Sequence, residues 1–207
     1  MIFHSLVVGP LGVNCYILGC GETREGVVVD PGGDAGKIAA AVEQLGLKIV
    51  HIINTHGHFD HVGANRTLLE RFGADLLIHA ADAPMLNRAA DIARSYGVPG
   101  ENSPQPGSFL SDGMEITFGK CRMTVQHTPG HTPGGCCLYI EAEKKVITGD
   151  TLFADSIGRT DLPGGSHEQL LESIRTKLFT LPDEVLVYPG HGPDSSIGHE
   201  KCYNPYF

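Results

Sequence analysis

Short apolar segments that lead into Asp or His residues recur along the chain. They are GVVVDPGG (26–33), KIVHIINTHGHFDH (48–61), MTVQHTPGH (123–131), KKVITGD (144–150) and EVLVYPGH (184–191). Brief Val- and Ile-rich runs bounded by Gly and Pro predict buried strands. If these strands share an orientation, their ends meet along one edge of the fold, where open α/β structures place their sites. The pattern therefore predicts a functional site made from strand ends.

Amphipathic segments between these runs predict helices of a single α/β domain spanning residues 1–207. Four helices are expected, over 34–46 with Gly46 as C-cap, over 61–73, over 80–97 with Pro84 near its start, and over 166–179 with Ser166 and Gln169 as a capping box. The Pro-, Gly- and Ser-rich stretch from Val98 to Gly113 predicts a long loop, and such loops often contact substrate.

Composition excludes several classes of partner. The net charge of −9 and the absence of a basic run argue against nucleic acid. No apolar stretch approaches the ~20 residues that span a bilayer, and the N-terminus lacks the features of a signal peptide, so a cytoplasmic protein is expected. The cysteines form no CxxC pair and are expected to be small buried hydrophobes rather than metal ligands or nucleophiles.

The segment INTHGHFDHVG (53–63) concentrates strong metal ligands in one short turn: His56, His58, Asp60 and His61. In an extended segment alternate residues point the same way, so the first three could converge. A loop that enters a helix at about His61 would direct its ligands two ways, and one segment could then serve two neighbouring metal ions.

The strand-end residues His131, Asp150 and His191 complete a set of seven ligands, enough for two ions. Imidazole and carboxylate suit zinc, iron or manganese, and a carboxylate can bridge two ions. Two such cations bring the pKa of a bridging water toward neutrality, which predicts hydrolysis of an acyl bond. Asp30 is either a turn residue before Pro31 or an acceptor that orients a ligand histidine.

The stretch THGHFDH resembles the HxHxDH signature of the metallo-β-lactamase superfamily, and the likeness extends over essentially the whole chain. It implies an αββα sandwich of two mixed sheets flanked by helices. It implies that His56, His58 and His131 bind a first metal, that Asp60, His61 and His191 bind a second, and that Asp150 bridges the two. Asp30 matches the early strand-end Asp of the superfamily.

Within the superfamily, the chain resembles the single-domain branch of glyoxalase-II-like hydroxyacylglutathione hydrolases. The resemblance rests on Asp150, on the stretch GDTLFADSIGRTDLPGGSHEQLLESI (149–174) and on the ending KCYNPYF (201–207). The two-domain members of the group add a helical C-terminal domain that binds glutathione, whereas this sequence ends soon after His191. Recognition of glutathione is therefore less firmly implied than thioester hydrolysis.

The resemblance implies a hydrolase of small acyl thioesters, such as S-lactoylglutathione, that uses a metal-bridging hydroxide. Two divalent ions are expected, zinc first, with iron or manganese as alternatives. Asp60 is expected to bind metal and to orient the hydroxide, and Arg159 is expected to border the substrate together with the loop Val98–Ser111. A small molecule is the expected partner, and the sequence predicts no oligomeric state.

Other functions are compatible with parts of the pattern. Persulfide dioxygenases of the same superfamily bind one iron and also carry a GRTD stretch, which is Gly158–Asp161 here, but Ile157 stands near the position of a Cys in those enzymes. A non-enzymatic metal-binding module would need closed coordination, which a bridging Asp with room for water disfavours. Nuclease members are larger or carry RNA-binding additions, and the acidic composition disfavours them.

Overall fold

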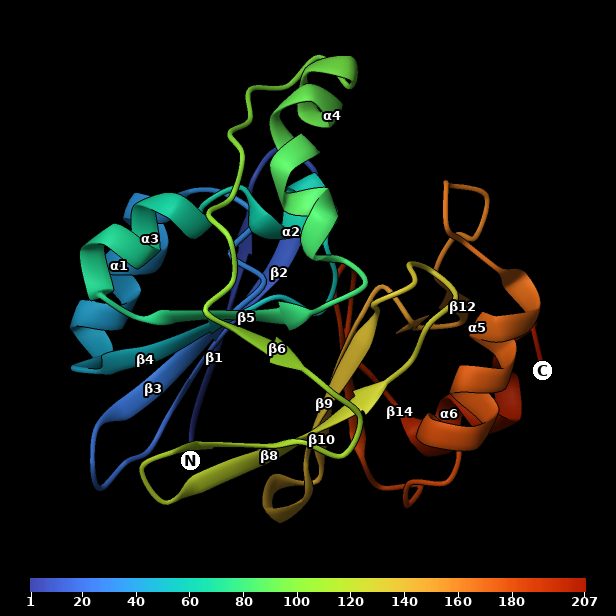
Figure 1. Cartoon of the computed structure of the whole chain (residues 1–207). Helices are drawn as coiled ribbons and strands as arrows, with labels where there is room; N and C mark the ends of the chain where they lie inside the picture. Colours follow the sequence, from blue (N-terminus) through green and yellow to red (C-terminus); the bar gives the residue numbers. More distant parts are fainter.

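Two six-stranded sheets pack face to face in the computed structural model, which describes all 207 residues (Figure 1). The first sheet has the order β1-β2-β3-β4-β5-β6, and its strands are β1 (Ile2–Val8), β2 (Val13–Gly19), β3 (Glu25–Val29), β4 (Lys48–Ile53), β5 (Asp75–His79) and β6 (Ser108–Leu110). The second has the order β14-β13-β10-β9-β8-β7, and its strands are β7 (Glu115–Phe118), β8 (Cys121–His127), β9 (Cys136–Ile140), β10 (Lys145–Gly149), β13 (Leu186–Pro189) and β14 (Ser195–Ser196). Strands β11 (Leu152–Phe153) and β12 (Ser156–Ile157) form a separate small hairpin. The strands of each large sheet therefore come from one continuous part of the chain, the first sheet from the N-terminal half and the second from the C-terminal half.

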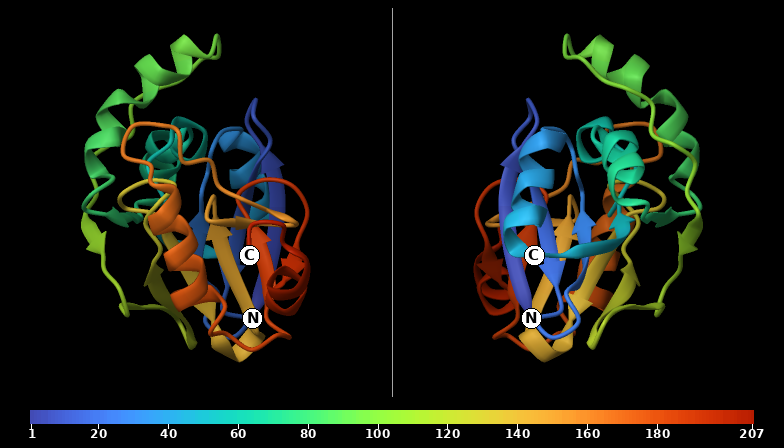
Figure 2. Two further views of the ribbon diagram at one scale, coloured as in Figure 1. Left: turned by 90° about the vertical axis from the view of Figure 1, so that its right-hand side faces the viewer. Right: turned by 90° about the vertical axis from the view of Figure 1, so that its left-hand side faces the viewer.

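Helices cover the outer faces of both sheets (Figures 1 and 2). On the first sheet lie α1 (Ala35–Leu45), α2 (Phe59–Val62) and α3 (Asn65–Phe72), while the 3₁₀ helix η1 (Ala83–Arg88) and α4 (Ala89–Ser95) project beyond the end of the sheet. On the second sheet lie α5 (His167–Ser173), the π-helical turn η3 (Ile174–Leu178) and α6 (Ile197–Tyr203), and a 3₁₀ turn, η2 (Glu141–Glu143), joins β9 to β10.

Three apolar cores separate the four layers. In β3, Val28 packs among residues of α1 and α3, whereas Val27 and Val29 point into the core between the two sheets. This alternation follows from the pleat, which directs successive side chains to opposite faces. A third core lies between the second sheet and α5, η3 and α6. The layers confirm the predicted αββα sandwich.

Strand direction brings the predicted strand ends together. Strands β3, β4, β5 and β6 are parallel to one another. Strands β10 and β13 are parallel, and β9 runs antiparallel to both β8 and β10, so β8, β10 and β13 also share a direction. The strands that lead into the candidate residues, β3 and β4 in one sheet and β8, β10 and β13 in the other, therefore share a direction within their sheet, which is the condition set for their ends to meet.

The predicted end of one helix and the predicted N-cap of another are confirmed. Helix α1 ends at Gly46, which has φ 63° and closes the helix in the left-handed conformation. Helix α5 follows its N-cap Ser166, whose hydroxyl accepts a hydrogen bond from the backbone N–H of Gln169. The predicted capping box is only half formed, because the N–H of Ser166 donates to the carbonyl of Gly130 instead of to the Gln169 side chain. After Ser173 the helix continues only as the π-helical turn.

Three other predictions need correction. The helix expected over 61–73 is two helices, and at the break the backbone N–H of Ala64 donates to the carbonyl of Pro31 (2.8 Å) rather than to a carbonyl of α2. The segment 80–97 is a 3₁₀ helix with Pro84 in its first turn, followed by α4. The loop predicted from Val98 includes strand β6, which pairs with β5 in parallel.

All six cysteines are free thiols, and Cys15, Cys20, Cys136 and Cys137 are buried as predicted. Cys202 is exposed and Cys121 is partly exposed, so the expectation of burial is wrong for Cys202 and only partly met for Cys121. None of the helices has the length and apolar character needed to cross a membrane.

Candidate metal centre

The predicted ligand residues meet at one edge of the two sheets. His56 and His58 follow β4, Asp60 and His61 lie in α2, and His131, Asp150 and His191 follow β8, β10 and β13. Their side-chain donors form three overlapping groups in which the ligand atoms lie within 4.8 Å of one another. The structure thus brings all seven residues together. The chain enters a helix at Phe59, two residues before the expected position, so Asp60 groups with His61 rather than with His56 and His58.

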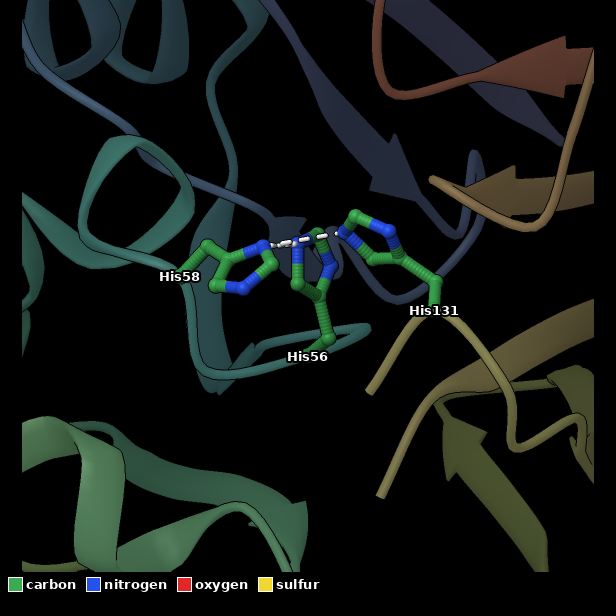
Figure 3. A group of neighbouring side chains, drawn as sticks. All are labelled: His56, His58 and His131. Carbon is green, nitrogen blue, oxygen red and sulfur yellow. Dashed lines mark hydrogen bonds between the residues drawn. The ribbon is translucent and has the colours of Figure 1, made fainter. Parts of the chain in front are cut away.

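The first group consists of three imidazoles whose nitrogens converge (Figure 3). Nδ1 of His58 lies 3.1 Å from Nε2 of His56 and 2.9 Å from Nε2 of His131. A tetrahedral ion with bonds of about 2.0–2.1 Å separates its nitrogen ligands by roughly 3.3 Å. The observed spacing is close to that value, so the three rings can hold one ion after a small adjustment.

The second group joins the short helix α2 to the loop after β13. Oδ2 of Asp60 lies 3.2 Å from Nε2 of His191 and 3.8 Å from Nε2 of His61. His61 is fully buried, while the side chain of His191 is 29% exposed to solvent. The group therefore opens to solvent on the His191 side.

Asp150 lies between the two groups, and its carboxylate faces residues of both. Its Oδ1 is 3.4 Å from Nε2 of His61, and its Oδ2 is 3.6 Å from Nε2 of His131 and 3.9 Å from Nε2 of His191. This is the position expected of a bridging carboxylate.

Hydrogen bonds fix which nitrogen each ring presents. Nδ1 of His61 donates to Asp30 at 3.0 Å, and Nδ1 of His56 lies 3.1 Å from the hydroxyl of Thr55, which itself donates to Asp30 at 2.7 Å. Nδ1 of His131 donates to the backbone carbonyl of Arg159 at 2.7 Å. In each case Nε2 is left free to bind metal. Asp30 is therefore an acceptor that orients ligand rings rather than a simple turn residue.

Strand β2 of the first sheet supports the loop that carries His191. The backbone N–H of Asn14 donates to Gly190, and its side-chain amide donates to the carbonyls of Pro189 and Gly192. The Tyr16 hydroxyl donates to the same Pro189 carbonyl at 2.6 Å. A Cβ at Gly190 would lie 2.3 Å from Oδ1 of Asp150, so only glycine lets this loop pass so close to the centre.

The two groups differ in protonation. Burial and neighbouring imidazoles lower the pKa of His56 well below its usual value and that of His58 to about 4. For His61, burial acts in the same direction, but the carboxylates of Asp150 and Asp30 outweigh it and raise the pKa well above its usual value. The pKa of His191 is also raised, because Asp60 and Asp150 outweigh its burial.

The donor set fits divalent metal. Nε2 of His61 and Oδ1 of Asp150 are both buried and make no hydrogen bond, although they are only 3.4 Å apart. Leaving buried polar atoms unpaired is costly, and a cation placed between them would satisfy both. Imidazole nitrogens with carboxylate oxygens are ligands for zinc, iron and manganese.

The predicted substrate residues lie beside this centre. Arg159 pairs with Asp161 through two hydrogen bonds of 2.8 and 2.7 Å, and its side chain is 54% exposed. From the long loop, Pro99–Glu101 lines a cavity of about 510 Å³ that Phe59 and Asp60 also border. The structure therefore places part of the predicted loop and the predicted catalytic Asp60 along one cavity.

Several contacts of the centre were missed from the sequence. Thr55 and Asn14 gave no signal beyond their ordinary polar character, and the carbonyl of Arg159 gave none at all because a backbone group has no sequence signature. Asn54, which donates from its side chain to the carbonyl of His61 at 3.1 Å, was identifiable only by its place at the end of an apolar run.

Comparison with known proteins agrees with this geometry. Residues 8–191 match the family model described as the metallo-beta-lactamase superfamily. The hydroxyacylglutathione hydrolase GloC of Haemophilus influenzae is 38% identical, covering 93% of this chain and 92% of that one. The probable metallo-hydrolase YqgX of Bacillus subtilis is 36% identical, covering 100% of this chain and 97% of that one.

Solved structures agree in fold over nearly the whole chain. The BLEG-1 B3 metallo-beta-lactamase has a TM-score of 0.92 and 36% identity, covering 99% of each chain. TTHA1623 in a di-iron-bound form has a TM-score of 0.91 and 38% identity, covering 99% of this chain and 100% of that one. ETHE1 from Myxococcus xanthus has a TM-score of 0.83 and 32% identity, covering 99% of this chain and 84% of that one. The signature residues, the paired sheets and the ligands gathered at their common edge thus have one explanation: the chain belongs to the metallo-beta-lactamase superfamily.

Proposed function

We propose that this protein hydrolyses small acyl thioesters, S-lactoylglutathione or related compounds, and depends on two divalent metal ions, zinc first among them. The position of Asp150 carries the proposal. Its Oδ1 is nearest to His61 of the second group and its Oδ2 is nearest to His131 of the first, so the carboxylate is placed to join two ions. The similarity to a hydroxyacylglutathione hydrolase supports the substrate class.

Two ions held by these residues would supply an activated water and a Lewis acid for the substrate carbonyl. The chain contributes the arrangement around them. The side chain of Asp60 is 12% exposed, so its carboxylate can accept a hydrogen bond from the water and orient the lone pair of the water oxygen toward the carbonyl carbon. A thiolate is a good leaving group and departs without a proton, so the site needs no strong general acid.

The surroundings of the centre support separate positions for the acyl group and the thiol portion of the substrate. The cavity bordered by Asp60 and Pro99–Glu101 has the size of sites that take small molecules. Its lining includes the carboxylates of Asp34 and Glu101 and no basic side chain, which suits an uncharged acyl group. An anionic thiol portion is better placed toward Arg159, where the exposed guanidinium can exchange Asp161 for a substrate carboxylate.

A second candidate function is persulfide dioxygenation. It is favoured by the likeness to ETHE1 from Myxococcus xanthus, and the di-iron form of TTHA1623 shows that a similar chain holds iron. Oxygenases commonly bind one iron through two imidazoles and one carboxylate, and His56, His131 and Asp150 offer that combination.

The deciding experiment measures two products side by side. Protein purified with its metal content determined is given S-lactoylglutathione without oxygen, and thiol release is followed. In parallel, oxygen consumption is followed with glutathione persulfide, and hydrolysis of a β-lactam serves as a third measurement because of the likeness to BLEG-1. Anaerobic thiol release is expected. Iron-dependent oxygen consumption without thiol release from any thioester would replace the hydrolase by the dioxygenase.

A further inference from the structure

Asp82 is a fully buried carboxylate that takes part in none of the ligand groups. It lies just before η1, and its own backbone is fixed by hydrogen bonds to the carbonyl of His79 (3.0 Å) and from the N–H of Met85 (2.9 Å). Its oxygens accept three hydrogen bonds: from the N–H of Gly57 at 3.0 Å, the hydroxyl of Thr132 at 2.7 Å and the N–H of Gly134 at 2.6 Å.

The three donors belong to the two loops that supply the first metal group. Gly57 stands between His56 and His58 in the loop after β4, and Thr132 directly follows His131 in the loop after β8. One oxygen of Asp82, Oδ2, accepts from both loops at once. The loops come from different sheets, so their separation is not set by strand pairing within either sheet.

We propose that Asp82 is a positioning residue that sets the metal affinity of the His56, His58 and His131 group by holding these two loops at a fixed separation. A backbone hydrogen bond from Cys136 to Thr55 (2.8 Å) also joins them, but it lies at the start of β9, five residues after His131. The inference rests on the proposed metal dependence. Its test measures metal binding directly, so it can fail while the hydrolase proposal stands.

The chemistry explains why a carboxylate occupies this position. An ionised carboxylate only accepts hydrogen bonds, and bonds to a buried charge are stronger than neutral ones. An asparagine of nearly the same shape has one accepting oxygen, so its NH₂ group would face either the Gly134 N–H or the pair formed by Gly57 and Thr132. At least one loop would then move away, and the spacing of the three imidazoles would change.

The test uses Zn²⁺ titrated into chelator-treated protein by calorimetry, with the absorption spectrum of bound Co²⁺ as a reporter of geometry. A His191→Ala background removes a ligand of the second group and so weakens it, and the tighter binding step is then assigned to the first group. Asp82→Asn is expected to weaken Zn²⁺ binding about 10- to 100-fold, the usual cost of losing a group that supports metal ligands, and to change the Co²⁺ spectrum.

Glu200→Gln in the same background is the matched control. Glu200 is also fully buried, and its carboxylate accepts from Asp155, Ser195 and Asn204, none of which belongs to the first group. Glu200→Gln should lower the melting temperature of the metal-free protein without changing its Zn²⁺ affinity or the Co²⁺ spectrum. If Asp82→Asn likewise leaves both unchanged, Asp82 has only a structural role and the proposal is wrong.

A second pair of variants decides the matter if Asp82→Asn does not fold. Thr132→Val removes one donor to Asp82 and keeps the shape, whereas Thr132→Ser keeps the hydroxyl. The proposal expects weaker Zn²⁺ binding for the valine variant and wild-type binding for the serine variant. Equal affinities in the two would overturn it.

Discussion

Asp150 is the residue on which the two-ion arrangement depends, since its oxygens face His61 on one side and His131 on the other. Replacing it by alanine removes a ligand from both groups. We expect Asp150→Ala to lower bound metal from about two ions per chain to one or fewer and to reduce thiol release at least about 100-fold. Metal analysis of the purified variant, paired with the thiol assay, measures both. Two bound ions and full turnover would rule out the bridging assignment.

The appropriate control is a carboxylate removed from the surface. Asp91 lies on α4, has a 75% exposed side chain and pairs only with Arg94 three residues away. Such exposed pairs contribute little, so Asp91→Ala should leave metal content and turnover near the wild-type values.

Arg159 makes contacts through its backbone carbonyl and through its guanidinium, and mutation of the side chain distinguishes the two. Its carbonyl orients His131 and survives substitution, whereas its guanidinium pairs with Asp161 at the surface. Arg159→Ala should therefore raise KM about threefold to tenfold while metal content stays constant. Asp161→Ala frees the guanidinium and should leave KM unchanged or lower it. Loss of metal with an unchanged KM would instead give the side chain of Arg159 a structural role.

At the scale of elements, β2 of the first sheet determines where a ligand of the second group lies. The Asn14 amide donates to two carbonyls on either side of His191. Asn14→Ala leaves those carbonyls without their donor and lets the loop after β13 move. We expect the second ion to bind about tenfold more weakly and the first ion to bind as before, measured by stepwise Zn²⁺ titration. Equal weakening of both ions would indicate a general loss of structure instead.

The elements also show what the sequence can and cannot predict. The strands that end in ligand residues were predictable because their apolar runs, the adjoining Gly and Pro and the polar residue that follows are all local signals. The division of α2 from α3 was not, because the backbone N–H of Ala64 at the break pairs with the carbonyl of Pro31, which is distant in sequence.

The same distinction holds for the candidate site. All seven predicted ligand residues meet in space, since His and Asp carry their chemistry visibly in the sequence. The groups that orient them are backbone carbonyls, as at Arg159, or common polar side chains, as at Asn14 and Thr55. Contacts of that kind are made only when β2, β4 and β13 are assembled, so no local pattern reveals them.

For the whole molecule, the different protonation of the two groups predicts an order of metal binding. The pKa of His58 is about 4 and that of His56 is lower than usual, so both rings are neutral at pH 6 and bind metal without losing a proton. His61 and His191 have raised pKa values and must release protons to the solvent. Binding of the second ion should therefore strengthen as the pH rises through the raised values, and it should depend on pH more steeply than binding of the first.

Calorimetric titration in buffers of different ionisation enthalpy counts the protons released with each ion. More protons are expected with the second ion than with the first, and the excess should shrink as the pH increases. Equal proton release for both ions would show that the carboxylates of Asp30, Asp60 and Asp150 do not keep His61 and His191 charged.

The division of the chain into one sheet per half has a consequence for reconstitution. The segment between β6 and β7 divides the ligand residues into two sets along the chain: His56, His58, Asp60 and His61 before it, and His131, Asp150 and His191 after it. Every ligand group of the centre contains residues from both sets. Two fragments cut at Ser111–Met114 would each contain a whole sheet but no complete group. Tight metal binding could then arise only from a complex of the two fragments, and the ion would serve as the reporter, and in part as the cause, of their complementation.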